Sequence, residues 1–499
     1  MRQHQRRIVT AVVAMLLPIC GWLAMSAAPP ERATELIRLA DWPSQTWFPL
    51  DGSERTIACE LPPGQRYRLV LGCLGNATQE HEVTVRLQTL PAKSQIDHQI
   101  FSTVRPLLRR GSTWAAPARE VRASLPTFAG THLPLVAARE FSLHVTDGCL
   151  DDPRQYAKIR ANNVACGARV RIFVDQQLAN GEIAQSRIDE LVDLLETDVL
   201  PRVQAQFGQL SDVDGDGCLS ILLTPWLSRL QGGRTSIGGM VRSSDFQQTV
   251  PPPLGNCCDL IFLNSNLPSS SALRDLLSHE VAHAACISQR LSPNGDLLRD
   301  EEDWLSEALA HLAEPGWSNL DHRLAAYLDD PSRYPLVVPD YYAAGLWRNS
   351  GCRGATYLFA RWCVGCGDPG LVRKLARCTK RGTRNVERVM DRSFAELFRE
   401  WTLSLASNDE LAAADLLSVL QRTGSADRSP EVCHAGCLER RLKIRGTAFD
   451  VIDLMVEESL PQVLHISHDS NSEWQFSICR WPENSQDDPS SNSLTAHKR

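Results

Sequence analysis

The segment His279-Glu280-Val281-Ala282-His283 constrains this chain more than any other feature of its sequence. On an α-helix, residues four apart lie on the same face, so both imidazoles can reach one metal ion. Glu280 then projects beside the open metal position, where a water molecule would need a proton acceptor. The chain has 13 histidines in 499 residues, and a chance H-E-x-x-H is then expected only about 0.02 times. The motif predicts a zinc site with its own general base; a helix whose two histidines only cap or fill a surface groove is the alternative.

The residues around the motif favour two helices. Three leucines precede it at helical spacing, and the serines at 269–271 are N-cap candidates. A second helix is predicted over 303–314, because apolar residues recur there at helical intervals and acidic residues crowd its first turn. Glu307 lies in this second segment. A third zinc ligand from a second helix is what a catalytic site requires, since it leaves the fourth position for water.

These two segments resemble a known family of metallopeptidases. The pattern H-E-x-x-H followed by W-L-x-E-[GA]-x-A is typical of gluzincins, and the layout is most similar to the hyicolysin-like branch. The resemblance covers residues 140–405, and its specific motifs lie within 259–314. It implies a zincin-like domain in which a sheet-containing upper lobe, the H-E-x-x-H helix and a helical lower lobe follow one another along the chain.

Carried over residue by residue, the resemblance implies that the zinc ligands are His279, His283 and Glu307. The spacing found in aminopeptidases of this class would select Glu302 instead. Glu307 is preferred because the Trp-Leu before it and the alanine after it frame it as the family frames its ligand. Glu302 stays open as an alternative ligand, and so, with less support, does Glu314.

The implied chemistry is hydrolysis of a peptide bond. Zinc lowers the pKa of its bound water to about 7, and Glu280 takes the proton as the water attacks a carbonyl carbon. The developing oxyanion needs a donor besides the metal, commonly Tyr or His. Tyr341 and Tyr342 lie in a loop-like segment after the ligand helix, and Tyr342 is the candidate taken from them. His311, one turn beyond Glu307, is either a hydrogen-bonding partner of a ligand or a half-buried histidine.

The amino terminus predicts export. Arginines within residues 1–7 precede an apolar run over 8–24, and small residues follow at 26–28. This order is typical of a secretory signal peptide, here residues 1–28, while an uncleaved membrane anchor is the alternative because the run is long enough to span a bilayer. A secreted, periplasmic or cell-surface protein is therefore expected.

Sixteen cysteines agree with an oxidising compartment, so disulfide bonds are expected. Cys433 and Cys437 are close enough in sequence for a local bridge. Cys363-Val364-Gly365-Cys366 has the spacing of a zinc knuckle and is flanked by Cys352 and Cys378. Disulfides are preferred there to a structural zinc site.

Patterning divides the chain into modules and predicts an α+β protein. Residues 31–145 alternate short β-patterned runs with Pro and Gly turns, which predicts an amino-terminal β-sandwich-like accessory domain. The zincin-like metallopeptidase domain is assigned to 146–410, with strands ahead of the motif helix. Residues 425–480 predict a small Cys-containing β appendage, and 481–499 a polar, disordered tail.

An aspartate-rich loop is a candidate calcium site. Asp212, Asp214 and Asp216 with Gly217 reproduce the start of a calcium-binding loop. Leu223 stands where an EF-hand has its glutamate, so a complete EF-hand is excluded and a further ligand would have to come from elsewhere. An Asp/Gly turn leading into a strand is an equally good interpretation.

Charge and composition narrow the class of protein. A net charge of −7 without a basic block gives no support for nucleic-acid binding, and only the amino-terminal run reaches membrane-spanning length. We therefore expect a secreted zinc metallopeptidase that acts on protein or peptide substrates. The alternatives are a catalytically inactive, peptidase-fold binding or cell-surface protein, and a structural module in which H-E-x-x-H is coincidental. Substrate preference, endo- or exopeptidase action and oligomeric state stay open.

Overall fold

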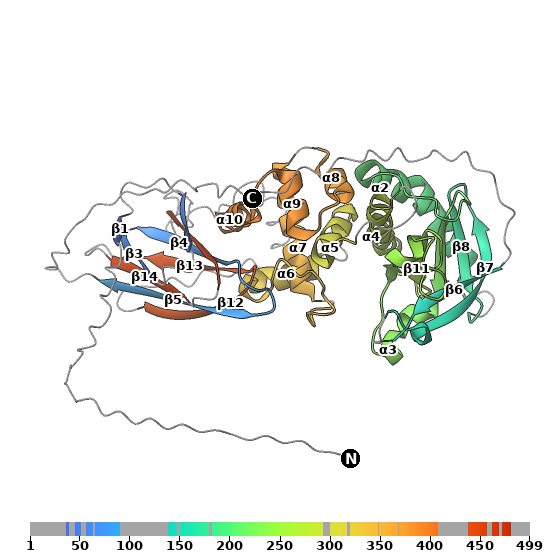
Figure 1. Ribbon diagram of the computed structural model, residues 1–499, viewed down its shortest axis with the longest axis horizontal. Helices are drawn as coiled ribbons and strands as arrows, with labels where there is room; N and C mark the ends of the chain where they lie inside the picture. Colours follow the sequence, from blue (N-terminus) through green and yellow to red (C-terminus); the bar gives the residue numbers. More distant parts are fainter. Residues whose placement is uncertain are drawn as a thin grey trace, which may run out of the picture. The chain divides into compact units, whose positions relative to one another are not determined.

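The structure is a computed structural model, shown in Figure 1, in which residues 36–499 form one compact unit. It describes residues 36–38, 45–50, 56–62, 65–89, 138–146, 150–178, 182–292, 300–316, 320–347, 349–367, 369–407, 438–456, 462–468 and 472–480. The predicted signal peptide at 1–28 and polar tail at 481–499 lie outside these residues. Of the helices described, none has the length and apolar character that crossing a bilayer would require.

Two sheets are built from strands that come from both ends of the described chain. One sheet has the order β1-β3-β14-β5-β12, and the other has the order β13-β4-β15-β2. The bounds are β1 Leu36–Arg38, β2 Gln45–Leu50, β3 Thr56–Leu61, β4 Arg66–Cys73, β5 Glu80–Thr89, β12 Leu438–Arg445, β13 Phe449–Met455, β14 Gln462–His468 and β15 Trp474–Arg480. All pairs are antiparallel except β1 with β3.

This pairing corrects the expectation of two separate β modules. β14, from the predicted appendage at 425–480, lies between β3 and β5 of the predicted accessory domain at 31–145. β15 likewise lies between β2 and β4. Val85 of β5 and Leu464 of β14 belong to the same apolar core. Either segment alone would expose unpaired strand edges and half of a core, and the two segments complete each other.

A third sheet carries the motif helix. Its order is β10-β11-β9-β8-β7-β6. The bounds are β6 Ala138–His144, β7 Tyr156–Cys166, β8 Val170–Asp175, β9 Leu219–Thr224, β10 Gly239–Val241 and β11 Leu260–Asn264. The central strands β8, β9 and β11 run parallel and are almost wholly buried, which explains their continuous apolar sequences. β6 pairs with β7 of this sheet, so the boundary predicted at residue 145 lies too late.

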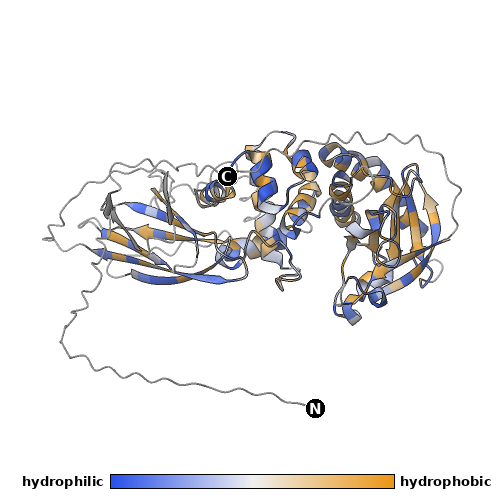
Figure 2. Ribbon diagram, in the orientation of Figure 1, coloured by the Kyte–Doolittle hydropathy of each residue, from blue (hydrophilic) through white to orange (hydrophobic). Residues whose placement is uncertain are grey.

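Alternation along β11 shows how the sheet holds its helices. Ile261 and Leu263 face the core that includes Leu277 and Val281 of the motif helix, while Phe262 faces the opposite core. On this side the helices are α1 Gln185–Leu194, the π-helical turn η3 Leu195–Val199, α2 Leu200–Phe207 and α4 Ser270–Gln289; a single turn, α3 Leu230–Gly233, follows β9. Figure 2 shows hydrophobic colouring along the strands of this sheet. A two-sided apolar sheet therefore fixes α4 in place.

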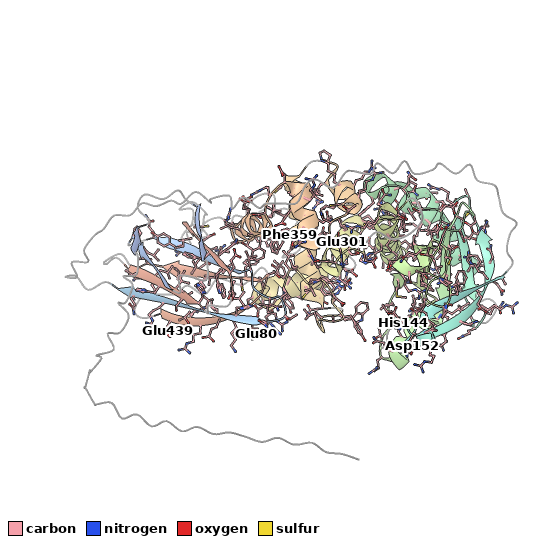
Figure 3. The ribbon with its side chains drawn as sticks, in the orientation of Figure 1. Glu80, His144, Asp152, Glu301, Phe359 and Glu439 are labelled. Carbon is pink, nitrogen blue, oxygen red and sulfur yellow. The ribbon has the colours of Figure 1, made fainter. Side chains whose placement is uncertain are left out.

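The remaining α-helices follow the motif helix along the chain and contribute to an aromatic cluster. They are α5 Asp303–Ala313, α6 Asp321–Asp329, α7 Ser350–Cys366, α8 Leu371–Arg377, α9 Gly382–Met390 and α10 Phe394–Ser407. The ring of Phe359 (labelled in Figure 3) lies 6.2 Å from Trp304 and 5.4 Å from Trp401 between ring centroids. Ser393 and Glu396 form a capping box at the start of α10, since each residue's backbone N–H donates to the other's side chain. The α+β class is confirmed.

The expected disulfide bonds are not found among the cysteines that the structure describes. Cys352 and Cys363 lie near opposite ends of α7, where a rise of 1.5 Å per residue puts about 16 Å of helix between them. This separation excludes a four-cysteine zinc site that includes both. Cys433 and Cys437 lie outside the described residues.

Candidate metal centre

Helix α4 presents both motif histidines on one face, as predicted. It begins after Ser269 and runs to Gln289. Its buried leucine, valine and alanine side chains pack on the sheet. The imidazoles of His279 and His283 meet edge to face, with ring centroids 4.8 Å apart. The one-turn spacing therefore brings two nitrogen donors together on a rigid element.

Helix α5 supplies the carboxylate. Asp303 and Trp304, in its first turn, donate their backbone N–H groups to the carbonyls of Pro339 and Val338, which anchors the helix start. Glu307 follows one turn later and reaches the histidines. Glu302, the alternative ligand, instead accepts a hydrogen bond of 2.9 Å from the Trp304 indole. Of the two candidates, the structure brings only Glu307 to the motif.

The three expected ligand atoms have the spacing of a tetrahedral zinc site. His279 Nε2 lies 3.2 Å from His283 Nε2 and 3.3 Å from Glu307 Oε2, and all three ligand atoms lie within 4.8 Å of one another. Ligands held at 2.0–2.1 Å around tetrahedral zinc are about 3.3 Å apart. The two separations from His279 Nε2 match this edge length, so the donor set fits zinc.

Hydrogen bonds orient both imidazoles for metal binding. His279 Nδ1 lies 2.8 Å from Glu314 Oε1, and His283 Nδ1 lies 3.1 Å from the Ser306 hydroxyl oxygen. When Nδ1 of each ring donates, the lone pair of each Nε2 points to the shared position. Two lone pairs facing each other at 3.2 Å are favourable only with a cation or a proton between them.

Glu314 and His311 form a buried layer behind His279. The side chain of Glu314 is fully buried, and its Oε1 also lies 2.6 Å from Nδ1 of His311. Nη1 of Arg323 lies 3.0 Å from Nε2 of His311. Glu314 was the less supported alternative ligand; besides accepting these hydrogen bonds, it forms with His279 and His311 a second group whose potential ligand atoms lie within 4.8 Å of one another. His311 is fully buried, and its polar contacts are to Glu314 and Arg323, so it meets the predicted ligands through Glu314 and by ring contact with His279 at 4.7 Å between centroids.

Arg353 is the contact that sequence reasoning missed. It lies in the first turn of α7, is 8% exposed, and its Nη1 donates to Glu307 Oε2. Its Cζ atom lies 5.6 Å from the ring centroid of Tyr341. The position is 46 residues from Glu307, and no local pattern marks it.

The protonation states of the metal-free site follow from burial and from these neighbours. Burial lowers the pKa of His279, but its hydrogen bonds to Glu307 and Glu314 outweigh burial and raise it to about 10. Burial and the charge on His279 lower the pKa of His283 to about 3. Burial raises the pKa of Glu307, yet Arg353 and His279 hold it well below its usual range. A proton on His279 thus takes the place of a metal ion.

Glu280 stands apart from the ligands as a buried acid. It is 5% exposed, and burial raises the pKa of its carboxyl group to about 7. Gly239 of the edge strand β10 lies against it, since a Cβ atom there would come within 2.8 Å of Glu280 Cγ. A glycine at this point leaves room for the carboxylate of Glu280 between α4 and β10.

The two tyrosines considered as oxyanion donors differ in burial. Tyr342 is 54% exposed, whereas Tyr341 is buried beside Arg353. The backbone N–H of Tyr341 donates to Asp303 Oδ2 at 2.8 Å, which holds the loop against α5. Of the predicted ligands, Glu307 is the one that the buried guanidinium of Arg353 contacts.

The aspartate-rich loop is held by contacts within the protein. Asp214 pairs with Arg139 at 2.6 Å, and Asp216 pairs with Arg171 at 2.8 Å. Asp212 accepts the backbone N–H groups of Asp216 and Gly217. Asp259, which the sequence did not suggest, takes the place of Asp216 beside Asp212 and Asp214. Neither these contacts nor any relative supports calcium there, and the turn interpretation accounts for the loop.

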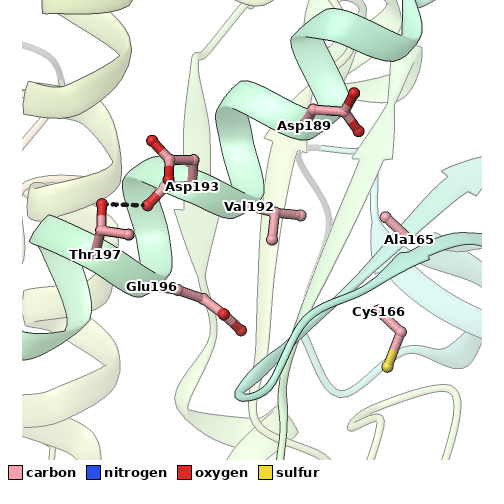
Figure 4. A pocket seen from close by; sticks show the side chains of 7 residues that line it. All are labelled: Ala165, Cys166, Asp189, Val192, Asp193, Glu196 and Thr197. Atoms are coloured by element: carbon pink, nitrogen blue, oxygen red, sulfur yellow. Dashed lines mark hydrogen bonds between the residues drawn. The ribbon is translucent and has the colours of Figure 1, made fainter.

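A separate groove lies where α1 and η3 pass the end of β7 (Figure 4). Its lining residues are Ala165, Cys166, Asp189, Val192, Asp193, Glu196 and Thr197. Glu196 Oε1 accepts the backbone N–H of Arg169 at 2.7 Å, and the Thr197 hydroxyl donates to the Asp193 carbonyl at 2.7 Å. These polar groups serve the local fold, and none of the predicted site residues lines the groove.

Comparison with known proteins supports the metallopeptidase interpretation in general terms. No model of a known family matches the chain. The chain is similar to the neutral metalloprotease ShpI of Staphylococcus hyicus, with 23% identity over 238 residues, which is 44% of this chain and 50% of that protein. The chain therefore spans half the length of this relative.

Solved structures add a distant likeness only. The M1 zinc metallopeptidase of Deinococcus radiodurans matches 57% of this chain and 60% of its own, with 13% identity and a TM-score of 0.25. A mutant of the same enzyme gives 12% identity and a TM-score of 0.24. At these values of identity and TM-score, the likeness does not indicate the function of this chain.

Proposed function

We propose that this chain is a secreted, gluzincin-type zinc metallopeptidase of the hyicolysin-like branch. Its zinc ligands would be His279, His283 and Glu307, and its general base Glu280. The observation that carries the proposal is that His279 Nε2 lies 3.2 Å from His283 Nε2 and 3.3 Å from Glu307 Oε2, close to the edge of a tetrahedral zinc site, with all three atoms within 4.8 Å of one another. The six-stranded sheet with α4 would form the upper lobe, and α5 to α10 the lower lobe.

The chain's own residues have the properties that peptide hydrolysis requires. Zinc bound here would supply Lewis-acid chemistry, activating water for attack on a carbonyl carbon. Glu280 accepts the proton of the attacking water and later gives it to the leaving amine. Burial favours this exchange, because a carboxyl group whose pKa is about 7 accepts and releases protons near neutral pH. Glu314 and Ser306 keep the two imidazoles in the tautomers that expose Nε2.

The edge strand β10 could pair with the backbone of a peptide substrate close to Glu280. β10 is the edge strand of the six-stranded sheet and lies beside α4 at Gly239 and Glu280. An extended peptide can add to such an edge by main-chain hydrogen bonds. A peptide held there would run past Glu280, which favours a protein or peptide as the substrate.

The decisive experiment compares hydrolysis of an unfolded protein by the zinc-loaded chain and by Glu280→Gln. Loss of a general base lowers the rate by roughly 10²–10⁴-fold, and zinc content should stay unchanged because Glu280 is not a ligand. The ligand assignment is tested with Glu307→Gln, which should lose zinc, against Glu302→Gln, which should retain it. Equal behaviour of Glu280→Gln and the parent in every assay would favour the alternative, a peptidase-fold binding protein without turnover.

A further inference from the structure

We infer that Arg353 donates hydrogen bonds to the carbonyl oxygen of the bond being cleaved, and so stabilises the negative charge that forms on it. The inference rests on the proposed peptidase function. It adds an oxyanion donor, for which the sequence had suggested a tyrosine. It makes Arg353 a catalytic residue of the proposed reaction, because its guanidinium would contact a reacting atom.

The guanidinium of Arg353 lies at the edge of the predicted ligand set. Arg353 Nη1 donates to Glu307 Oε2, and this oxygen lies 3.3 Å from His279 Nε2. The guanidinium is therefore one hydrogen bond away from an atom of the ligand triangle. A substrate oxygen drawn to the same centre would arrive within reach of the remaining N–H groups.

The packing of α7 fixes the guanidinium there. Asn349 caps the helix by accepting the backbone N–H of Cys352 at 3.0 Å. Gly354 brings α7 against α6 so closely that a Cβ atom would lie 2.3 Å from the carbonyl oxygen of Arg323. The Tyr341 ring covers the guanidinium on another side. A side chain held on several sides keeps its orientation during a reaction, which is what electrostatic stabilisation requires.

Arg353 has N–H groups beyond the one that it donates to Glu307. An arginine side chain has five N–H donors in a planar fork. Within the described part of the chain, Glu307 is the acceptor that the Arg353 side chain reaches. A cation that is more than nine-tenths buried is costly unless it is paired and hydrogen-bonded. No nitrogen of Arg353 is among the described side-chain atoms that are both fully buried and without a hydrogen-bond partner, so its donors beyond the one that pairs with Glu307 are open to an anionic oxygen.

The chemistry of the step is balanced by the residues present. Water oxygen bonds to the carbonyl carbon, its proton moves to Glu280, and the electron pair of the C=O π bond moves onto the carbonyl oxygen. Arg353 donates most strongly to that oxygen in this charged state. When the C–N bond breaks, its electron pair leaves with nitrogen, nitrogen takes the proton from Glu280, and the carbonyl re-forms.

The test uses the zinc-loaded full chain and its Arg353→Met and Arg353→Lys variants. The probe is a phosphinic peptide, whose tetrahedral anionic group resembles the charged intermediate and is not cleaved. Calorimetry gives its Kd, competition with a chromogenic chelator gives zinc affinity, and peptide hydrolysis gives kcat and KM. Arg290→Met is the matched control, because Arg290 forms a comparably buried pair with Glu301 away from the ligands (Glu301 is labelled in Figure 3).

With both proteins saturated with zinc, we expect Arg353→Met to weaken phosphinate binding and to lower kcat by roughly 10²–10³-fold each, with KM little changed. Zinc affinity should fall by no more than about 10–100-fold, the usual cost of losing a partner of a ligand such as Glu307. Arg353→Lys should recover part of both losses, and Arg290→Met should lose neither. The inference would be overturned if zinc-loaded Arg353→Met bound the phosphinate as tightly as the parent. It would also be overturned if Arg290→Met and Arg353→Met weakened phosphinate binding equally. So would a loss that follows zinc affinity alone, since Arg353 would then serve only to hold Glu307.

The inference and the proposed function fail in different ways. A parent that binds the phosphinate through Arg353 but cleaves no peptide would contradict the peptidase proposal and leave the oxyanion site intact. If Arg353→Met cleaved peptides as fast as the parent, the peptidase proposal would be retained, and Arg353 would have no part in the chemical step.

Discussion

His279 Nδ1 lies 2.8 Å from Glu314 Oε1, with the Glu314 side chain fully buried behind the ring. Because that nitrogen is engaged, the imidazole can turn only Nε2 toward His283 and Glu307. Glu314 is shared with His311, so one carboxylate sets the orientation of a predicted ligand and of its neighbour. The orientation of His279 at the candidate metal position is thus set by Glu314, which lies behind the imidazole ring.

Replacing Glu314 with Gln is expected to weaken zinc binding by about 10–100-fold, the usual cost of losing such a supporting carboxylate. The amide keeps the shape but removes the charge that orients His279. Competition with a chromogenic chelator measures the change. Glu302→Gln is the control, since Glu302 hydrogen-bonds Trp304 and not the histidines. Unchanged zinc affinity in Glu314→Gln would show that His279 needs no such support.

Zinc affinity should rise with pH. The pKa of His279 in the metal-free protein is raised to about 10 by its carboxylate partners, which outweigh burial, so zinc must displace a proton below that pH. The apparent affinity should increase about tenfold per pH unit between pH 7 and 9. Proton release on zinc addition in a weakly buffered solution provides a second readout. A pH-independent affinity over this interval would mean that His279 is already neutral.

The metal-free protein should lose stability as the solution becomes alkaline. The pKa of His279 is raised from 6.5 in an unfolded chain to about 10 in the fold. Its contribution is therefore fully present below pH 6.5 and lost as pH rises through about 10. Thermal unfolding in chelator should give a Tm that falls from pH 6.5 to 10, and a His279→Gln variant should fall less steeply. Equal slopes for the two proteins would exclude His279 as the cause.

Proteolytic activity should decline on the acidic side of neutrality. Glu280 acts as a base only when ionised, and burial raises its pKa to about 7 in the metal-free protein. The positive charge of a bound metal favours the carboxylate, so the acidic limb of kcat/KM should lie at or below pH 7. A profile measured from pH 4.5 to 8 tests this. Activity that falls as pH rises from 5 to 7 would contradict a base with this environment.

Gly239→Ala should impair the base without removing the metal. The added Cβ would come within 2.8 Å of Glu280 Cγ and Oε1, so the carboxylate must move. A displacement of about 1 Å at a reacting group can lower the rate roughly 10²-fold. Gly238→Ala is the control, because its Cβ would meet only the flexible end of Leu276 at 3.2 Å. Equal kcat values for the two variants would mean that β10 does not constrain Glu280.

The sequence by itself determined the helices of the metal centre and three of the residues that meet there. The helical period around residues 270–289 and 303–313, together with the one-turn histidine spacing, predicts where His279 and His283 lie because such patterns are local. The Trp-Leu and Ala around Glu307 favoured it over Glu302, and it is Glu307 that lies beside His279 in the fold. The buried runs of β8, β9 and β11 are also local signals, since a strand covered on both faces is apolar throughout.

Only the tertiary structure decided what surrounds these residues. Arg353 meets Glu307 because α7 packs on α5. Asp259 replaces Asp216 beside Asp212 because β11 begins next to the loop. β14 inserts between β3 and β5, so segments expected as two modules close one core. Periodicity reports which face of an element is apolar, but not which distant element covers that face. Such pairings follow from the packing of complementary surfaces over the whole chain.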